Sequence, residues 1–238
     1  MFAAQSEVWG LYLEALRLHA HQLLVWAHSD VRFRLHPDLD EPSITGLLGD
    51  AMKARLNCHP DTPAEYDHYT IADQDPISPS GQLGNDRLRL DLCVIRSGIR
   101  PRLAYIFEAK RLRAGGFPIG KYAGDRGIGD FIECRYGAGS PEAVMIGLFQ
   151  NKDAAYWLGE LNRIFDEDCT NSHPRLEIVD NLTPVRIHDG LPNELQSRHR
   201  RRDSSQIRLF HIFLDCTLND VGAAHPSHTG MEPGRLSG

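Results

Sequence analysis

Apolar residues near the start of the chain recur at intervals of three and four positions, which predicts one helix from Ser6 to about Ser29. Ser6 can cap its first turn. The apolar surface is wider than one helix face needs, so we expect it to be covered from more than one side, or to bind a second copy or a partner protein. This surface comprises Val8, Leu11, Tyr12, Leu13, Ala15, Leu16, Leu18, Leu23 and Leu24. The histidines of this helix are predicted to be exposed or helix-capping residues; they are His19, His21 and His28.

A second helix is predicted to begin at residues 40–43, where two acidic residues, a proline and a serine form a typical first turn. The positions that follow at helical spacing are Ile44, Leu47, Leu48, Ala51, Met52 and Arg55. Residues 57–85 are polar and rich in proline, aspartate and glycine, which is typical of a loop.

The residues from Arg87 to Arg113 contain two apolar runs of strand length, separated by a turn-rich segment at 97–101. The two-residue period of a strand places Asp91 on one face with Arg89 and Cys93, opposite Leu88, Leu90, Leu92 and Val94. It places Glu108 and Lys110 with Ile106, opposite Leu103, Tyr105, Phe107 and Ala109. Charged residues are disfavoured in mid-strand and are rarely buried without a partner. If the strands pair, the two carboxylates and the ammonium can meet at one end of a sheet.

Asp91, followed after sixteen residues by Glu108-Ala109-Lys110, resembles the motif of the PD-(D/E)xK nucleases, the restriction-endonuclease-like superfamily. The resemblance implies an α/β fold with a mixed central β-sheet flanked by helices. It also implies a Mg²⁺ ion, or Mn²⁺, held by Asp91, Glu108 and the carbonyl of Ala109. Hard oxygen ligands suit such an ion, which polarises a phosphodiester and activates water. Lys110 would orient or deprotonate that water, or neutralise charge on phosphorus. Leu90 stands where the motif has proline.

The same residues allow a simpler interpretation, because a glutamate and a lysine two positions apart on an exposed strand usually form a solvated ion pair. The start of the second helix, EPSITGLL, is similar to the first core helix of these nucleases, and the resemblance implies Glu41 as a fourth metal ligand, with Asp50 as a poorer substitute. The helix dipole alone also favours an acidic residue at this position.

Residues 111–139 are rich in glycine and mix basic with aromatic residues. The candidate nucleic-acid contacts here are Arg111, Arg113, Lys121 and Arg126. Tyr122, Phe131 and Tyr136 either stack on bases or belong to the core. The glycines match no nucleotide-binding loop, so we expect no nucleotide cofactor. The basic patch at 198–202 adds Arg198, Arg200 and Arg201 as candidate phosphate contacts, with a solvated loop as the alternative.

The continuous apolar run 143–149 predicts a strand that is buried on both faces. A turn and cap at 150–153 then precede a helix, with apolar positions from Ala154 to Phe165. Gln150 ends the strand near the expected site and is a candidate auxiliary residue. Further strands are predicted at 176–179, 185–188 and 207–214, and a flexible tail at 222–238. We therefore expect an N-terminal helical extension at 1–36, a nuclease-like domain at 37–221 and the tail.

The chain of 238 residues carries a net charge of −6, so any nucleic-acid surface must be local. Its five cysteines lack metal spacing, its start lacks a basic signal region, and no apolar run has membrane-spanning length. We therefore expect a cytoplasmic protein with no membrane partner.

Together these features predict a Mg²⁺-dependent nuclease acting on DNA, and the resemblance suggests a role in restriction or phage defence. A catalytically silent subunit that binds DNA or a partner protein is the alternative. A second alternative keeps the site with RNA as the substrate. Many such nucleases act as dimers, which makes a homodimer a further expectation.

Overall fold

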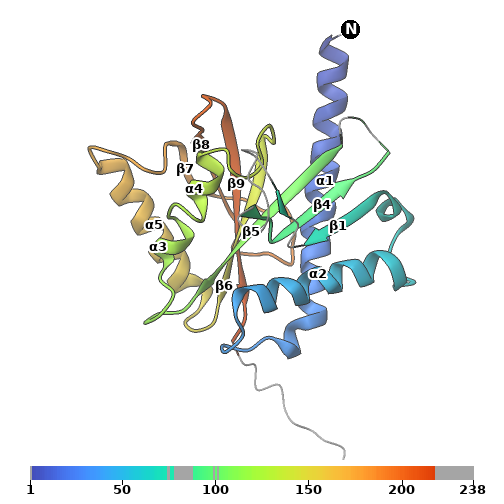
Figure 1. Ribbon diagram of the computed structural model, residues 1–238, viewed down its shortest axis with the longest axis horizontal. Helices are drawn as coiled ribbons and strands as arrows, with labels where there is room; N and C mark the ends of the chain where they lie inside the picture. Colours follow the sequence, from blue (N-terminus) through green and yellow to red (C-terminus); the bar gives the residue numbers. More distant parts are fainter. Residues whose placement is uncertain (1, 74–75, 78–87, 99, 101, 218–238) are drawn as a thin grey trace, which may run out of the picture.

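The computed structural model describes residues 2–73, 76–77, 88–98, 100 and 102–217; the predicted tail at 222–238 lies outside them. A seven-stranded mixed sheet forms the centre, in the order β1-β4-β5-β6-β9-β8-β7 (Figure 1). Its strands are β1 (Tyr69–Asp73), β4 (Leu92–Arg96), β5 (Leu103–Leu112), β6 (Glu142–Phe149), β9 (Gln206–Asp215), β8 (Leu195–Arg200) and β7 (Ile178–Pro184). Strands β5, β6 and β9 run parallel, and the other neighbours pair antiparallel. Two short strands, β2 (Pro76–Ile77) and β3 (Leu88–Arg89), form a separate pair.

Helices cover both faces of this sheet, as Figure 1 shows. One face packs against α1 (Phe2–Val31) and α2 (Glu41–Cys58). The other packs against α3 (Ile119–Tyr122), α4 (Ile128–Ile132) and α5 (Ala154–Thr170). Short 3₁₀ turns occupy Arg32–Arg34 and Ala64–His68. The predicted α/β class, with a mixed sheet flanked by helices and an N-terminal helix, is confirmed.

Strand β5 divides its side chains between the two cores as its alternation predicted. Tyr105, Phe107 and Ala109 join the core beneath α1 and α2, whereas Ile106 and Leu112 join the core beneath α3, α4 and α5. All residues of β6 are buried, in agreement with its continuous apolar run. Helix α5 begins at the predicted cap, because the carboxylate of Asp153 accepts a 2.8 Å hydrogen bond from the backbone N–H of Tyr156.

The first run of alternating residues, Leu88 to Val94, predicts one strand, and this prediction is wrong. The run is interrupted between β3 and β4, and Leu90 packs in a different core from Leu92 and Val94. The interruption reverses the face of Leu90, because a strand that breaks no longer keeps its two-residue period. Asp91 lies at this interruption, directly before β4.

Helix α1 is more than an extension of the domain. Most of its apolar residues from Leu16 to Val31 belong to the core on one face of the sheet, whereas Val8, Leu11 and Leu18 are exposed. The prediction of exposed or capping histidines is wrong. His21 is fully buried, with its Nε2 3.0 Å from the hydroxyl of Tyr105. His19 and His28 also have partners: the Nδ1 of His19 lies 2.8 Å from the hydroxyl of Tyr69, and the Nε2 of His28 donates to the carbonyl of Asp215 at 3.0 Å. These contacts fasten α1 to the strands.

Other predictions also need correction. Strand β1 lies within the predicted loop 57–85, and residues 185–188 form no strand. Strand β8 includes the first three residues of the basic patch, Arg198, His199 and Arg200, and pairs with β9. Within 111–139 the aromatic residues Tyr122, Phe131 and Tyr136 are buried in the core, which decides against base stacking. No helix among the described residues has both the length and the apolar character needed to span a membrane.

Candidate active site

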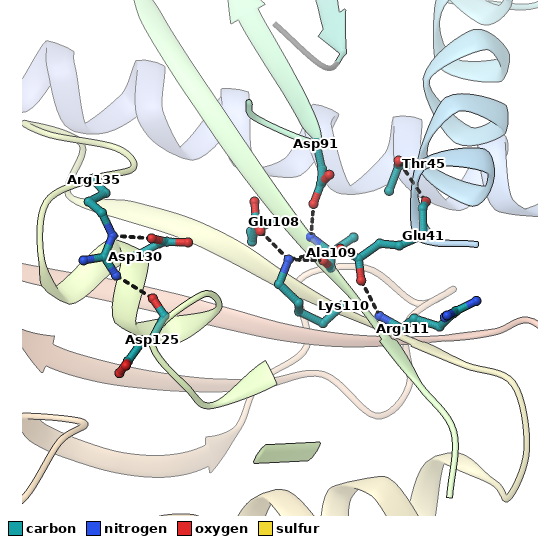
Figure 2. Close-up of polar contacts among 10 residues, drawn as sticks. All are labelled: Glu41, Thr45, Asp91, Glu108, Ala109, Lys110, Arg111, Asp125, Asp130 and Arg135. Atoms are coloured by element: carbon teal, nitrogen blue, oxygen red, sulfur yellow. Dashed lines mark hydrogen bonds and ion pairs between the residues drawn. The ribbon is translucent and has the colours of Figure 1, made fainter. Parts of the chain in front are cut away.

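The site lies where β5 extends beyond the start of β4 (Figure 2). Every second amide of β5 faces β4, but the pairing of these strands ends with Leu92 opposite Phe107. The next two amides on that side are bound by carboxylates instead. Ala109 N–H donates to Asp91 Oδ2 at 2.8 Å, and Arg111 N–H donates to Glu41 Oε2 at 2.8 Å. The two acids thus take the place of a neighbouring strand at this edge of β5, and they satisfy the backbone N–H groups of Ala109 and Arg111.

Lys110 joins these groups to one another. Its Nζ lies 2.5 Å from Glu108 Oε1 and 3.1 Å from Glu41 Oε1, and it donates to the carbonyl of Ala109 at 2.8 Å. The structure therefore brings together Asp91, Glu108, Lys110 and Glu41, from three separate segments of the chain (Figure 2).

Glu41 is positioned by the start of α2. Asp40 caps this helix, since its Oδ1 accepts a 2.9 Å hydrogen bond from Ser43 N–H, and Pro42 occupies the first turn. Glu41 is then the first helical residue and points toward β5 (Figure 2). Asp50 lies exposed further along α2, and the contacts of the described residues do not link it to the site.

Burial controls the charge of these acids. Burial raises the pKa of Asp91 to about 6, although Lys110 and the Ala109 N–H oppose the shift. Burial, followed by the neighbouring charge of Asp91, raises the pKa of Glu108 well above its usual value. Burial lowers the pKa of Lys110, but the adjacent carboxylates, Glu108 first, outweigh it and leave the pKa raised. Lys110 is therefore a stable cation beside two acids that resist full ionisation.

One oxygen indicates that the site suits a cation. Glu108 is only 3% exposed, and its Oε2 is buried without a hydrogen-bond partner among the described residues. A buried carboxylate oxygen in this state is unfavourable unless it takes up a proton, as the raised pKa of Glu108 allows, or a further positive charge approaches it. Asp91, Glu108 and the Ala109 carbonyl are the oxygen donors that could hold Mg²⁺ here. Within the part of the chain that the structure describes, no group of three or more His, Cys, Asp or Glu side chains is arranged so that it could hold a metal ion.

A cleft of about 700 Å³ adjoins Lys110 and Glu41, and many of the side chains that line it are basic. Its lining residues are Asp40, Glu41, Pro42, Lys110, Arg111, Phe117, Gly120, Lys121, Gly124, Asp125, Arg126 and Arg175. Five of these side chains are basic and three are acidic, in a chain whose net charge is −6. The cleft is therefore a local positive region in an acidic protein, as a site for phosphate groups requires.

Three of the predicted nucleic-acid contacts, Arg111, Lys121 and Arg126, line this cleft. Arg111 is held firmly: its guanidinium lies 3.6 Å from the centre of the Phe117 ring and donates to the carbonyl of Leu39 at 3.1 Å. Arg175, the fifth basic residue, was not predicted, because it lies alone in a polar segment without a local motif.

The other predicted contacts lie elsewhere. Arg113 donates to the carbonyl of Pro37 at 3.2 Å and does not line the cleft. Arg198 pairs with Asp180 on the outer strands, three strands away from β5. Arg200 is the last residue of β8. Arg201 is buried, and its guanidinium donates a 2.9 Å hydrogen bond to the carbonyl of Gly137. The basic patch thus comprises the last residues of β8 and the two that follow them, and the structure does not bring it to the site.

Gln150 lies near the site without touching its charged groups. Its Nε2 donates to the carbonyl of Leu39 at 2.6 Å, the same oxygen that Arg111 contacts. Leu39 immediately precedes Asp40 and Glu41. Gln150 therefore helps to fix the start of α2.

One further acid near Glu108 escaped the sequence analysis. Asp130 of α4 is buried and forms an ion pair with Arg135 (Figure 2). Its negative charge contributes to the raised pKa of Glu108. Burial, and then the charges of Glu108 and Asp130, raise the pKa of Tyr136, which the sequence analysis left as a stacking or core residue. Only the fold brings Asp130 close to Glu108, and no local pattern in the glycine-rich segment could have identified it.

Comparisons of this chain with family models, with curated proteins and with solved structures found no match. The fold and the site together define an α/β protein with a mixed sheet, whose open strand edge carries three carboxylates and a lysine beside a basic cleft.

Proposed function

We propose that this protein is a Mg²⁺-dependent nuclease of the PD-(D/E)xK type, which hydrolyses phosphodiester bonds in DNA. One observation carries the proposal: Asp91, Glu108 and Lys110 meet at one end of the sheet, beside a cleft lined by basic residues. A solvated surface ion pair would not need a buried glutamate with an unpartnered oxygen.

Asp91, Glu108 and the Ala109 carbonyl would hold the Mg²⁺ ion, or Mn²⁺, and Glu41 would complete the acidic set. When bound, the metal polarises the phosphodiester and favours ionisation of a water molecule. The raised pKa of Lys110 supports a role as an ammonium that orients the water and stabilises charge on the phosphate, and argues against a role as a base. The cations of the cleft would bind the flanking phosphates.

The alternative is a catalytically silent subunit that binds DNA or a partner protein. It is favoured by the position of Lys110, whose ammonium lies on Glu108 Oε1 and on the Ala109 carbonyl, two oxygens that a metal would need. The exposed Val8 and Leu11 on α1 would suit a protein partner.

The test incubates the purified chain with supercoiled plasmid in Mg²⁺, in Mn²⁺ and in EDTA. We expect cleavage with either metal, none in EDTA, and loss of cleavage in Lys110→Ala and Asp91→Ala. Arg186→Ala is the control, because Arg186 is exposed and pairs only with Asp189 among the described residues. Cleavage that survives in both site variants would refute the assignment, and no cleavage by any form would favour the silent subunit.

Two further measurements test the choice between DNA and RNA and the proposed role in phage defence. A parallel digestion of single-stranded and double-stranded RNA distinguishes the RNA alternative, which predicts that RNA is cut faster than DNA by the same residues. For a role in defence, we expect bacteria that express the chain to resist phage infection and bacteria that express Lys110→Ala to be as sensitive as those that lack the chain.

A further inference from the structure

Two basic residues of the cleft, Lys121 and Arg175, have no catalytic role in the proposal above. They belong to different walls: Lys121 lies in α3, and Arg175 lies between α5 and β7. Among the described residues neither forms an ion pair, although the Lys121 ammonium lies 5.1 Å from the centre of the Phe117 ring. Lys110, by contrast, is bound to two carboxylates. The charges of Lys121 and Arg175 are therefore available to an anion that enters the cleft.

A buried chain of hydrogen bonds ends next to each of these residues. Tyr122, which follows Lys121, has its hydroxyl 2.9 Å from His211 Nδ1. Leu176, which follows Arg175, offers its carbonyl to His199 Nδ1 at 2.6 Å. Ser197 joins the two histidines, with its hydroxyl 2.8 Å from His211 Nε2 and 2.7 Å from His199 Nε2.

The charge states of the histidines fix the direction of this chain. Burial lowers the pKa of His199 to about 4 and that of His211 to about 3, so both rings are neutral at physiological pH. His199 must donate from Nδ1 to the Leu176 carbonyl, and its Nε2 therefore accepts from Ser197. Ser197 then accepts from His211 Nε2, whose Nδ1 accepts from the Tyr122 hydroxyl. The Met145 carbonyl, 3.1 Å from the same hydroxyl, is a second acceptor for Tyr122. A buried network of this kind holds its members rigidly.

A second contact fixes the wall that carries Arg175. The buried carboxylate of Asp168 accepts hydrogen bonds from the backbone N–H groups of Arg175 at 2.9 Å and Leu176 at 3.0 Å. The backbone at Arg175 and Leu176 is thus held by two side chains: Asp168 accepts from both N–H groups, and His199 donates to the Leu176 carbonyl. The backbone on both walls is prearranged, which reduces the ordering needed when an anion binds.

We propose that Lys121 and Arg175 form a second phosphate-binding subsite, which holds the nucleic-acid backbone away from the phosphate that is cleaved. This inference rests on the proposed function for the identity of the ligand. A lysine and an arginine that contact phosphate oxygens carry no sequence information, so the subsite contributes affinity without sequence preference.

The experiment measures the affinity of the full chain for a short fluorescein-labelled DNA strand by fluorescence anisotropy in EDTA, over a range of salt concentrations. The double variant Lys121→Ala, Arg175→Ala is expected to bind roughly tenfold more weakly, since charge-assisted bonds to two phosphates are lost. The slope of log affinity against log salt should become shallower by about two. The control is Arg186→Ala, Arg202→Ala, which removes the same charge from residues that are 73% and 78% exposed outside the cleft. The control should bind as the unaltered chain does.

Equal affinity and equal salt slope in the two double variants would overturn the subsite. In cleavage assays with Mg²⁺, we expect the cleft variant to raise KM and to leave kcat unchanged, whereas Lys110→Ala lowers kcat. If the protein cuts DNA through Lys110 and the cleft variant binds normally, the subsite fails and the proposed function stands. If no form cuts DNA but the cleft variant alone loses affinity and salt dependence, the proposed function fails and the subsite stands.

Discussion

Two buried acid–base pairs lie on opposite faces of the sheet and differ in how completely they are satisfied. On the α1 face, both oxygens of Glu142 accept from the guanidinium of Arg17, each at 2.8 Å. On the other face, Lys110 divides one ammonium among Glu108, Glu41 and the carbonyl of Ala109. Glu142 has its full complement of donors, whereas Glu108 keeps one buried oxygen without a partner in the described part of the chain.

This difference separates a structural pair from one that is suited to chemistry. A bidentate arginine neutralises a buried carboxylate and gives it fixed geometry, so the Arg17–Glu142 pair joins α1 to β6. A shared ammonium leaves Glu108 incompletely neutralised. Burial, followed by the charge of Asp91, raises the pKa of Glu108 well above its usual value, and such a shift is typical of functional sites. The predictions below test whether the two pairs respond differently to the same kind of change.

The largest expected effect is on catalysis. Glu108→Gln keeps the shape of the side chain but removes its charge, so we expect the rate of plasmid cleavage to fall by a factor on the order of a thousand. Glu142→Gln is the matched change on the other face, and it should cut at nearly the unaltered rate at temperatures where it is folded. Initial rates in Mg²⁺, with circular dichroism as a check of folding, measure both. Equal loss in the two variants would show that Glu108 contributes to folding alone.

The second effect is on stability. Arg17→Met keeps an apolar stem but leaves Glu142 without a cation, so we expect the free energy of unfolding to fall by about 2 to 3 kcal/mol. The arginine side chain is 18% exposed, which places the loss below that of a fully buried pair. Urea unfolding followed by tryptophan fluorescence measures it. Replacing Glu142 by methionine in the same chain should recover most of the loss, and no recovery would show that packing alone was disturbed.

The sequence was sufficient to predict the local elements that carry the site. Alternation in β5 placed Glu108 and Lys110 on one face, and acidic and proline residues marked the start of α2 at Glu41. Both are properties of neighbouring residues, and local sequence determines them directly.

The remaining features depend on contacts between distant segments. Strand β8 escaped prediction because His199 and Arg201 look like part of a solvated basic patch, whereas the fold buries both. Arg175 and Asp130 approach the site from segments that have no local motif. The break before β4 depends on Asp91 bonding to the Ala109 amide, a contact that no propensity scale includes.

The third prediction concerns pH. The pKa of Asp91 is raised to about 6 by burial, so the folded chain keeps this proton to a higher pH than the unfolded chain does. The stabilising contribution is therefore full below the unfolded pKa of about 4 and is lost as the pH rises through about 6. Asp91→Asn cannot ionise, and its amide oxygen can still accept from Ala109. We expect this variant to exceed the unaltered chain in stability by about 2 kcal/mol at pH 8 in EDTA.

Urea unfolding at several pH values tests this, and the advantage of Asp91→Asn should disappear near pH 4. Glu142→Gln provides the contrast, because it replaces the charged partner of Arg17 by an amide group and should be less stable than the unaltered chain. If Asp91→Asn also lost stability at pH 8, the charge of Asp91 would be fully compensated in the fold. The distinction between the acids around Lys110 and the Arg17–Glu142 pair would then fail.

The smallest expected effect tests how the site depends on its surroundings. Gln150→Leu removes the 2.6 Å hydrogen bond to the carbonyl of Leu39, but Arg111 still donates to that oxygen at 3.1 Å. We therefore expect less than about 1 kcal/mol of lost stability and a loss of cleavage of roughly threefold to tenfold. The loss should appear in kcat with KM unchanged, because the carbonyl lies just before Glu41 and the substrate contacts of the cleft are intact. Gln206→Leu, at an exposed position of β9, is the control. An unchanged kcat in Gln150→Leu would show that Arg111 alone suffices to hold the start of α2 against β5.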